Sequence, residues 1–343
     1  MASIEDVARR AGVSPITASR VVRSHPNVTP ATRERVQRAI AELNYIPNGV
    51  ARGLRQSRSG LIALIITDIT SPFFTAVARG AEDAARAAGM KLILGNSDDD
   101  AEIEAEYLRS MGEHRVDGVV LVPTEHARQA LGNRLPKTMP IVLLDRGVAG
   151  VEADLVRCDT GTATRELCRH LWKLGRRRIA IVGGAPSSPT WYERVDGYRA
   201  ALGEAGYVPS DDFVVPGDYT PDAGGEAVRH LLALSPPPDA IIAANAQVAH
   251  GVLDALVAHG RRVPDDIAVA AIDDPLPPSA FWPRLTVVEQ PGYEMGKAAV
   301  DLILSRLAHP RTQEPARELV FPATLKIGVS CGEEARVRKG SEA

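Results

Sequence analysis

The chain has 343 residues, more than one ordinary hydrophobic core accommodates, so we expect a small module and a larger body of two parts. Hydrophobic residues make up 45% and charged residues 24%, values typical of globular proteins, and no apolar run approaches the roughly eighteen residues that span a bilayer. These features argue against a membrane protein. Because the N-terminal segment lacks the apolar core and cleavage site of a secretory signal, we expect a cytoplasmic protein with no membrane partner.

The formal net charge of −3 conceals two oppositely charged segments. Residues 1–60 contain ten arginines, no lysine and four acidic residues, which gives a charge of +6. The remaining 283 residues contain 30 basic and 39 acidic side chains, which gives −9. A basic head on an acidic body is typical of a protein in which one module contacts a polyanion such as DNA. On charge alone, a merely solvated charged face stays open as the alternative.

Three short helices are predicted within the basic segment. Ser3 and Asp6 form an N-cap pair, and Gly12 ends the first helix. The second helix has Ser14 as its cap and Pro15 in its first position. Its outward or leading residues are Ile16, Thr17, Ser19, Arg20 and Arg23. Hydroxyl groups can bond phosphates or base edges and arginine can bind guanine through two acceptors, so this helix suits the major groove of DNA.

Apolar residues at helical spacing give the three helices a common core. The third helix begins at Thr29 and Pro30, again a cap followed by a first-turn proline. The residues expected in the core are Ile4, Val7, Ala8, Ala11, Ala18, Val21, Val22, Val36, Ala39, Ile40 and Leu43. A helix, a tight turn, a second helix and a supporting helix make up the helix-turn-helix arrangement.

The segments IEDVARRAGVSPITASRVV and NVTPATRERVQRAIAELNYIPNGVARGLR resemble the DNA-binding end of the lactose-repressor (LacI/GalR) family. Relative to the common family pattern, Ala18 stands where valine is usual. The DNA contacts that this resemblance implies are Ser14, Pro15, Ile16, Thr17, Ser19, Arg20, Arg23, Tyr45, Asn48, Ala51, Leu54 and Arg55.

The same resemblance implies that residues 48–55 form a hinge helix, that two such helices pair in the minor groove, and that Leu54 wedges open the central base step. Gly49 and Gly53 weaken this eight-residue helix, so we expect it to be disordered in the absence of DNA. A purely flexible linker over residues 46–60 is the alternative.

From Leu61 onward, short apolar runs alternate with amphipathic stretches. The runs are LIALIIT, KLILG, GVVLV and PIVLLD before Asp159, and RRIAIVGG, DAIIAAN and DIAVAAID after it. This alternation predicts two similar halves, each a parallel sheet with helices on both faces. No GxGxxG or GxxxxGKS/T motif follows a strand, which argues against a dinucleotide or nucleoside triphosphate, and we expect no cofactor.

Polar residues stand at the carboxyl ends of the predicted strands, where two facing parallel sheets bind ligands in the cleft between them. These residues are Asp68, Ser71, Asp145, Arg146, Asn245, Asp273 and Asp274. Each alone could be a cap or turn residue, but their convergence on one cleft favours a binding function.

The chain after residue 60 also resembles the periplasmic-binding-protein type I core, through TSPFF, LDR, TWYERVDGY, GDYT, AAN, IDD and FWPRLTVVEQP in family order. The effector contacts that this resemblance implies are Phe73, Phe74, Asp145, Arg146, Thr190, Arg194, Tyr219, Asn245 and Asp273. Aromatic rings beside charged groups suit a sugar or a flat polar metabolite. Two residues depart from the family pattern. Ala246 replaces a common aspartate, which can alter the cleft or its closure, and Gly328 replaces a usual arginine, which we expect to affect packing.

The predicted fold class is α/β: an N-terminal all-α helix-turn-helix DNA-binding domain and a periplasmic-binding-protein type I core of two doubly wound parallel-sheet subdomains. The expected ranges are 1–46 for the DNA-binding domain, 47–60 for the hinge helix and linker, 61–332 for the effector-binding core and 333–343 for the tail. Within the core, the first subdomain comprises about 61–159 and 290–320, and the second about 160–289 and 321–332.

Three functions are candidate explanations of these features. A repressor that binds a palindromic DNA operator as a homodimer under the control of a small molecule, such as a sugar, accounts for the basic head, the hinge and the cleft together. A solute-binding protein of a transporter accounts for the cleft alone. A doubly wound enzyme lacks a recognisable assembly of nucleophile, base and orienting group, so we expect no enzymatic activity. The cysteines Cys158, Cys168 and Cys331 lack CxxC spacing, so we expect reduced thiols and no metal site.

Overall fold

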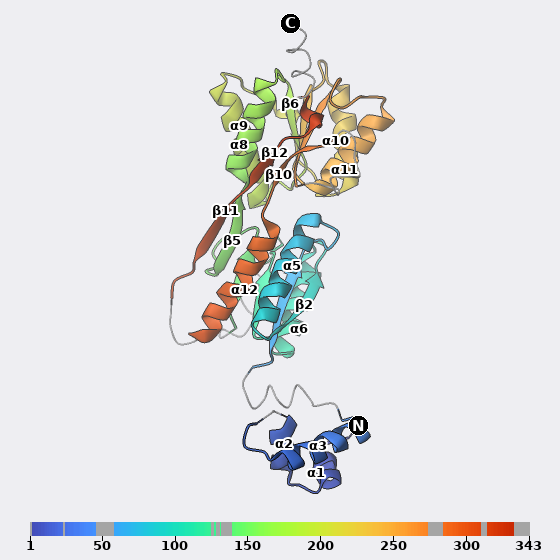
Figure 1. Ribbon diagram of the computed structural model, residues 1–343. Helices are drawn as coiled ribbons and strands as arrows, with labels where there is room; N and C mark the ends of the chain where they lie inside the picture. The colour runs from blue at the N-terminus through green and yellow to red at the C-terminus, as the bar shows by residue number, and fades with distance from the viewer. Residues whose placement is uncertain are drawn as a thin grey trace, which may run out of the picture. The chain divides into compact units, whose positions relative to one another are not determined.

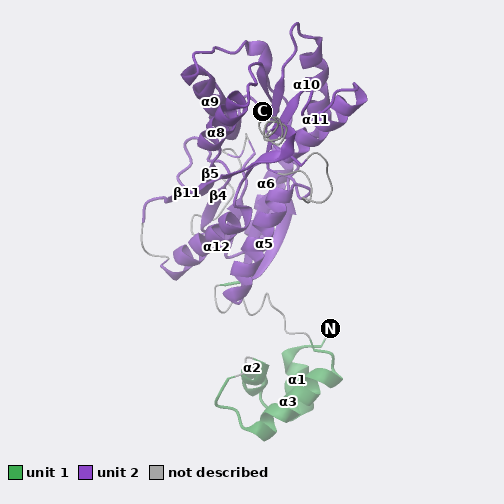
Figure 2. Ribbon diagram, turned by 45° about the horizontal axis from the view of Figure 1, so that its top comes forward, with its two compact units in different colours: residues 1–59 green, residues 60–343 purple. Residues whose placement is uncertain are grey.

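A computed structural model of the chain describes residues 2–22, 25–45, 58–124, 127, 131, 139–273, 284–309 and 314–332. The chain divides into two compact units, residues 1–59 and residues 60–343, which we call the head and the core (Figure 2). None of the described helices is long and apolar enough to cross a membrane. The predicted hinge at 48–55 and the tail at 333–343 lie outside the described residues.

The head contains three helices, α1 (Ile4–Ala11), α2 (Pro15–Val22) and α3 (Pro30–Glu42). Ser3 and Asp6 form a reciprocal capping box at the start of α1, and Gly12 ends this helix with a φ of 63°. At the start of α3, the Thr29 side chain accepts a hydrogen bond from the backbone of Thr32. These three predicted helices and their caps are confirmed.

The head has a hydrophobic core of its own. Its buried members are Val7, Ala8, Ala11, Ala18, Val21, Val36 and Ala39. Ile40 and Leu43 are partly buried and pack against this cluster. Arg10 of α1 also forms an ion pair with Glu42 of α3, with the two atoms 2.7 Å apart. Because an exposed ion pair contributes at most about 1 kcal/mol, the apolar cluster is what holds the three helices together.

The core contains two six-stranded sheets (Figure 1). The first sheet has the order β11 (Glu318–Pro322), β5 (Asp154–Asp159), β4 (Ile141–Leu144), β3 (Gly118–Leu121), β1 (Leu61–Ile66) and β2 (Lys91–Asn96). All its neighbouring strands are parallel. Together with α5 (Pro72–Ala87), α6 (Ala101–Glu113) and α12 (Gly292–Ala308) it forms the first lobe.

The second sheet has the order β12 (Thr324–Lys326), β10 (Thr286–Glu289), β9 (Ala268–Ile272), β8 (Ala240–Ala243), β6 (Ile179–Val182) and β7 (Val214–Val215). Its neighbouring strands are parallel except β10 and β12, which are antiparallel. Together with α8 (Thr160–Lys173), α9 (Pro189–Glu204), α10 (Pro221–Ala233) and α11 (Ala246–Ala258) it forms the second lobe. Two short 3₁₀ helices, Asp211–Phe213 and Val329–Cys331, also belong to this lobe. The predicted pair of doubly wound sheets is confirmed apart from the antiparallel edge pair.

The apolar runs of the sequence do not predict β5, β7 or β11. Buried and half-buried side chains alternate along β5, so this strand has no continuous apolar run. The strand β7 has only two residues, and four of the five residues in the edge strand β11 are exposed. A strand that is exposed on one face or at an edge does not need the apolar composition of a buried one.

Three connections join the two lobes. The chain passes from β5 to α8 at Asp159, from β10 to α12 through residues 290–291, and from β11 to β12 through Ala323. The first lobe therefore takes α12 and β11 from the C-terminal part of the chain, and each lobe is discontinuous in sequence.

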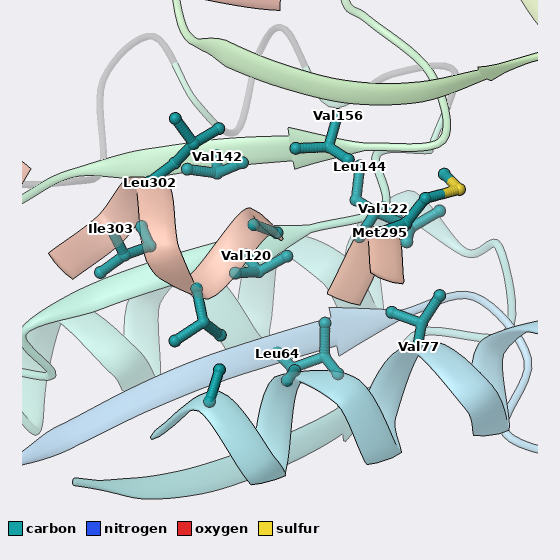
Figure 3. Packing of buried hydrophobic residues seen from close by; sticks show 14 of the residues in the cluster. Leu64, Val77, Val120, Val122, Val142, Leu144, Val156, Met295, Leu302 and Ile303 are labelled. Carbon is teal, nitrogen blue, oxygen red and sulfur yellow. The ribbon is translucent and has the colours of Figure 1, made fainter. Parts of the chain in front are cut away.

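One hydrophobic cluster fills the space between the first sheet and helices α5 and α12 (Figure 3). Its labelled members are Leu64, Val120, Val122, Val142, Leu144 and Val156 on the sheet side and Val77, Met295, Leu302 and Ile303 on the helices. Two glycines allow the helices to meet backbone to backbone. A Cβ added at Gly80 would lie 1.9 Å from the carbonyl oxygen of Tyr293, and one added at Gly296 would lie 2.0 Å from that of Val77. Any larger residue would force the two helices apart.

Replacing Gly296 by alanine should therefore lower the free energy of unfolding of the core by about 1–3 kcal/mol, the usual cost of overpacking. The matched control is Gly203→Ala in α9, because a Cβ added there meets nothing within 4 Å. This control should be neutral or stabilise the protein by up to about 1 kcal/mol, since alanine favours a helix more than glycine does. Urea denaturation measures both changes. Equal midpoints for the two variants would contradict the tight α5–α12 contact.

Candidate functional site

The helix α2 presents an exposed edge on the head. Ser14, Ile16 and Arg20 are exposed, Ile16 to 69%, whereas Ala18 of the same helix is fully buried. The backbone N–H of Thr17 donates a hydrogen bond to the Ser14 hydroxyl at 3.2 Å, and the two hydroxyl oxygens lie 2.9 Å apart. Ser14 therefore caps α2 as predicted. A helix start with hydroxyls, an exposed aliphatic side chain and an arginine offers the groups that read base edges and thymine methyls.

The other residues predicted to contact DNA lie elsewhere. Tyr45 is half-buried and packs against the hydrophobic core of the head. Pro15 is exposed and Ser19 is half-buried, both on α2. The remaining five fall outside the described residues, namely Arg23, Asn48, Ala51, Leu54 and Arg55.

A cavity of about 700 Å³ lies at the carboxyl ends of the strands and is lined by residues of both lobes. It brings together all nine residues predicted as effector contacts, which are Phe73, Phe74, Asp145, Arg146, Thr190, Arg194, Tyr219, Asn245 and Asp273. Other lining residues include Thr67, Asp68, Ser71, Asp98, Asp99, Ser187, Asp218 and Gln290. A volume of this size accommodates a small metabolite.

Two aspartates occupy equivalent strand ends in the two lobes. Asp145 follows β4, and its backbone N–H donates a hydrogen bond of 2.8 Å to the carbonyl of Val156 on β5. Asp273 follows β9, and its backbone N–H donates one of 2.8 Å to the carbonyl of Val288 on β10. Both have positive φ, 71° and 60°, a conformation that aspartate tolerates better than most residues. The backbone thus turns each carboxylate toward the cavity in the same way.

Burial controls the electrostatics of both carboxyls. Burial raises the pKa of Asp273 to about 6, although hydrogen bonds from Gln290 and the charge of Arg194 act to lower it. The backbone N–H and the side-chain Nε2 of Gln290 lie 3.1 and 2.8 Å from the Asp273 carboxylate oxygens. Burial also raises the pKa of Asp145, against the charges of Arg146 and Arg194.

Two buried guanidinium groups stand beside these carboxylates. Arg146 donates to the carbonyl of Pro123 at 2.7 Å and forms an ion pair with Asp99 at 2.9 Å. Arg194, only 4% exposed, donates to the carbonyl of Ala244 at 2.7 Å, and its Nε has no hydrogen-bond partner among the described residues. Arg194 therefore bonds to the protein through one nitrogen, whereas Arg146 bonds to it through two.

Aromatic and hydroxyl groups cover the rest of the cavity. The rings of Phe73 and Phe74 have centroids 5.0 Å apart at a tilt of 56°. The Tyr219 and Thr190 hydroxyl oxygens lie 3.3 Å apart, and Thr190 lies 2.9 Å from Ser188. Ring faces next to oriented hydroxyls suit the apolar and polar faces of a sugar ring.

The start of α11 lies at the rim of the cavity. The side chain of Asn245 accepts a hydrogen bond from the backbone of Val248 at 2.8 Å, so it caps α11. The next residue but one, Gln247, donates to Thr70 of the first lobe at 2.7 Å and lies 3.4 Å from Asp68. This amide joins the two lobes beside the cavity. Among the described residues, no group of three or more His, Cys, Asp or Glu is arranged to hold a metal ion.

Comparison with known proteins accounts for both units. Residues 3–48 match the family described as bacterial regulatory proteins, lacI family, and residues 59–327 match periplasmic binding proteins and sugar binding domain of LacI family. The chain belongs to the LacI family. As a LacI-family repressor it binds DNA and is not an enzyme, and the predicted family and fold class are confirmed.

The similarity to individual relatives extends over nearly the whole chain. The ribose operon repressor of Escherichia coli K12 is 34% identical over 330 residues, which cover 96% of this chain and 99% of that protein. The solved complex of the transcriptional regulator CelR with cellobiose is 33% identical, with a TM-score of 0.70, and covers 96% of this chain and 100% of that chain. The lac repressor dimer bound to operator and the anti-inducer ONPF is 27% identical, with a TM-score of 0.81, and covers 96% and 99%.

Some residues of the cavity of this LacI-family protein were not selected from sequence. Gln290 directly follows β10, and Asp98 and Asp99 follow β2, so the rule that polar residues gather at strand ends could have found all three. Of the two departures from the family pattern, Gly328 has a packing reason, because a Cβ there would lie 2.3 Å from the carbonyl oxygen of Arg284. Ala246 is buried at the start of α11 and is not among the described residues that line the cavity.

Replacing Gln290 by alanine removes one donor from Asp273 and should raise the pKa of Asp273 further above about 6. A carboxyl whose pKa is higher in the folded than in the unfolded state destabilises the folded protein at pH values above its unfolded-state pKa. For Asp273 this destabilisation decreases as the pH falls through about 6. The variant should therefore lose about 1–3 kcal/mol of unfolding free energy at pH 7.5 and less at pH 5.

Urea denaturation at the two pH values measures this difference. The matched control is Gln247→Ala, which removes an amide from the rim without uncovering a buried carboxylate and should show no such pH dependence. A loss for Gln290→Ala that is the same at both pH values would contradict the link to Asp273.

Proposed function

We propose that this repressor binds a palindromic operator as a homodimer and that a sugar or a related polar metabolite in the cavity controls its affinity for DNA. The observation that carries the proposal is the convergence of nine predicted effector contacts, from both lobes, on one cavity. The solved complexes of CelR with cellobiose and of the lac repressor dimer with operator support the same pairing of ligand and DNA in relatives.

In this proposal residues 1–46 of the head read the operator, and residues 47–60 form the hinge and linker to the effector-binding core. The exposed edge of α2 supplies Ile16, Thr17 and Arg20 to base edges, and Ser14 and Ser19 bond phosphates or bases. Two heads of a dimer then contact half-sites about one helical turn apart. The hinge assignment rests on the family resemblance alone.

Control by ligand follows from the two-lobed core. A ligand between the lobes contacts Asp145 of the first lobe and Arg194 and Asp273 of the second, so its binding free energy depends on the angle between the lobes. The bonds from Gln247 to the first lobe favour one such angle in the absence of ligand. The ligand then changes the affinity for the operator by the ratio of its own affinities for the two arrangements of the lobes.

The full chain tests this function in two steps. Selection of bound sequences from a random DNA pool should return an inverted repeat. Sugars that raise the melting temperature of the protein by binding its folded state should then change the affinity for that repeat. Enrichment of a single unrepeated site would contradict the dimer, and a stabilising sugar without effect on DNA affinity would contradict ligand control.

Replacing Arg20 by alanine should reduce discrimination between operator variants by about 1–3 kcal/mol, because Arg20 is exposed on α2 and reads a base. Titration of the variant on several operator sequences measures this effect. The matched control is Arg38→Ala on α3, an exposed arginine paired with Glu34, which should leave discrimination unchanged. Uniform weakening of all sequences by Arg20→Ala would show that Arg20 contacts only the phosphates.

Replacing Leu54 by alanine should reduce the bend at the operator centre and weaken specific binding, because the smaller side chain cannot hold a base step open. Gel mobility of circularly permuted operator fragments measures the bend. If the variant bends and binds the operator as the parent does, the wedge assignment is wrong.

A further inference from the structure

Arg157 stands where two strands leave the first lobe. It lies on β5, opposite Val320 of β11, and two residues later the chain crosses to α8 at Asp159. The strand β11 runs parallel to β5 and crosses to the second lobe through Ala323. The two strands lie side by side in Figure 1. A long side chain at this position can therefore reach both lobes.

The guanidinium group of Arg157 has a partner in each lobe. Within the first lobe, its Nε donates a hydrogen bond to the carboxylate of Glu318 on β11. In the second lobe, the carboxylate of Glu193 on α9 lies 3.6 Å from its Nη1. The side chains of Arg157 and Glu193 are 27% and 37% exposed, so salt screens this pair less than a fully exposed one. One arginine thus joins the two lobes.

Three carboxylates surround this guanidinium group. Burial disfavours the charge of Arg157, but Glu318, Glu193 and Asp159 act against burial and raise its pKa. Burial raises the pKa of Glu193, whereas the charges of Arg157 and Arg194 act to lower it. Without Arg157, the carboxylates of the two lobes would repel one another at this place. The pair is therefore an attraction between the lobes that a neutral residue would not replace.

Glu193 belongs to a rigid part of the second lobe. Its helix, α9, also carries Thr190 and Arg194, which line the cavity. Glycines bring α9 and α8 together backbone to backbone, since a Cβ added at Gly197 would lie 2.1 Å from the carbonyl oxygen of Gly161. Close-packed elements transmit strain, so a force on Glu193 acts on both helices and on the two cavity residues together.

The Arg157 pair and the Gln247 contact hold the lobes at two separate places. Gln247 of α11 bonds to Thr70 in the loop between β1 and α5, whereas Glu193 of α9 pairs with β5. In the first sheet β1 and β5 are three strand positions apart, which is about 14 Å. A body held at one point can turn about that point in any direction, but two separate points leave only the line between them as an axis. Arg157 thus supplies a restraint that the contact at the rim alone cannot supply.

We infer that Arg157 is a positioning residue that sets the angle between the lobes: through its pair with Glu193 it holds α9 at a fixed distance from the first lobe. Neither residue is among the described residues that line the cavity. The inference deepens the proposed ligand control and rests on it for the effect on DNA, because a ligand that requires another angle must break this pair. A partly exposed ion pair changes an equilibrium by at most about fivefold, so a bound ligand can overcome it.

Distances between the lobes of the full chain test this role. Spin labels on the exposed substitutions Arg109→Cys in α6 and Val208→Cys in the second lobe report the distance by double electron–electron resonance, and the three native cysteines are buried. Mixing with excess unlabelled chain leaves one labelled chain in each homodimer, so that only distances within a chain are measured. All variants, and the parent with which they are compared, carry Gln247→Ala, which removes the contact at the rim.

Arg157→Glu should shift the distance distribution, because four carboxylates then meet where the chain crosses between the lobes. Adding Glu193→Arg restores an interlobe pair with reversed charges and should return the distribution to that of the parent. The matched control is Glu318→Arg, which restores only the pair within the first lobe and should leave the shift in place. An unchanged distribution with Arg157→Glu, or equal recovery with either arginine, overturns the inference.

A milder variant keeps the test decisive if Arg157→Glu does not fold. Glu193→Gln leaves the bond from Arg157 to Glu318 in place and should change the ratio of the lobe arrangements by about two- to fivefold. Salt at about 1 M should remove the difference between this variant and its parent, because it screens the ion pair. A Glu193→Gln protein with the distribution of the parent at low salt contradicts the role of Arg157.

The effect on DNA is measured separately, with Gln247 in place. Glu193→Gln should change the affinity of the ligand-free protein for the selected inverted repeat by about two- to fivefold, whereas Glu318→Gln should not. Distances that respond to Glu193→Gln while the operator affinity does not would show that the proposed control of DNA binding through the lobe angle is wrong, and that Arg157 still positions the lobes.

Discussion

Parallel strand pairing is the constraint on which this molecule depends. In a parallel sheet every strand ends at the same edge, and the returning helices cover the faces. The core applies this arrangement twice, so that Asp145 and Asp273 turn off equivalent strands with the same backbone bond to the next strand. The buried strands themselves need only be apolar. A few residues just beyond their ends therefore set the chemistry of the cavity, and those residues can change without disturbing the sheets.

The sequence predicted most of the fold because the buried strands are continuous apolar runs and the caps are recognisable polar residues. It also predicted the nine cavity residues, since strand ends and family motifs point to the same positions. What it could not give is which bonds these residues form. Asn245 caps α11, and Gln290 donates two hydrogen bonds to Asp273. Such differences depend on the register between strands, which one strand's sequence does not encode. The same holds for β7 and β11, whose exposed or very short segments lack the pattern of a buried strand.

In the head, the residues that stabilise the fold are different from the exposed residues that we propose for DNA recognition. Its core consists mostly of alanine and valine, and the ends of its helices are held by short-range caps. Ile16 and Arg20 take no part in this core and lie on the opposite side of α2 from Ala18. If α2 reads the operator as proposed, a change at either exposed position can therefore alter which DNA sequence is bound at little cost in folding free energy. In the core, stability and ligand binding conflict, because the cavity that we propose for the ligand is lined by buried charged residues.

The order of synthesis gives the discontinuous first lobe a particular vulnerability. Its sheet and α5 are made early, but α12 and β11, which close its hydrophobic cluster and complete its edge, come from the last quarter of the chain. Until they emerge from the ribosome, the face of the sheet that carries Val120, Val142 and Val156 lacks α12 to pack against and is exposed to aggregation. The head needs none of these late segments. A chain that ends early would thus retain a folded DNA-binding module after losing the lobe through which a ligand controls it.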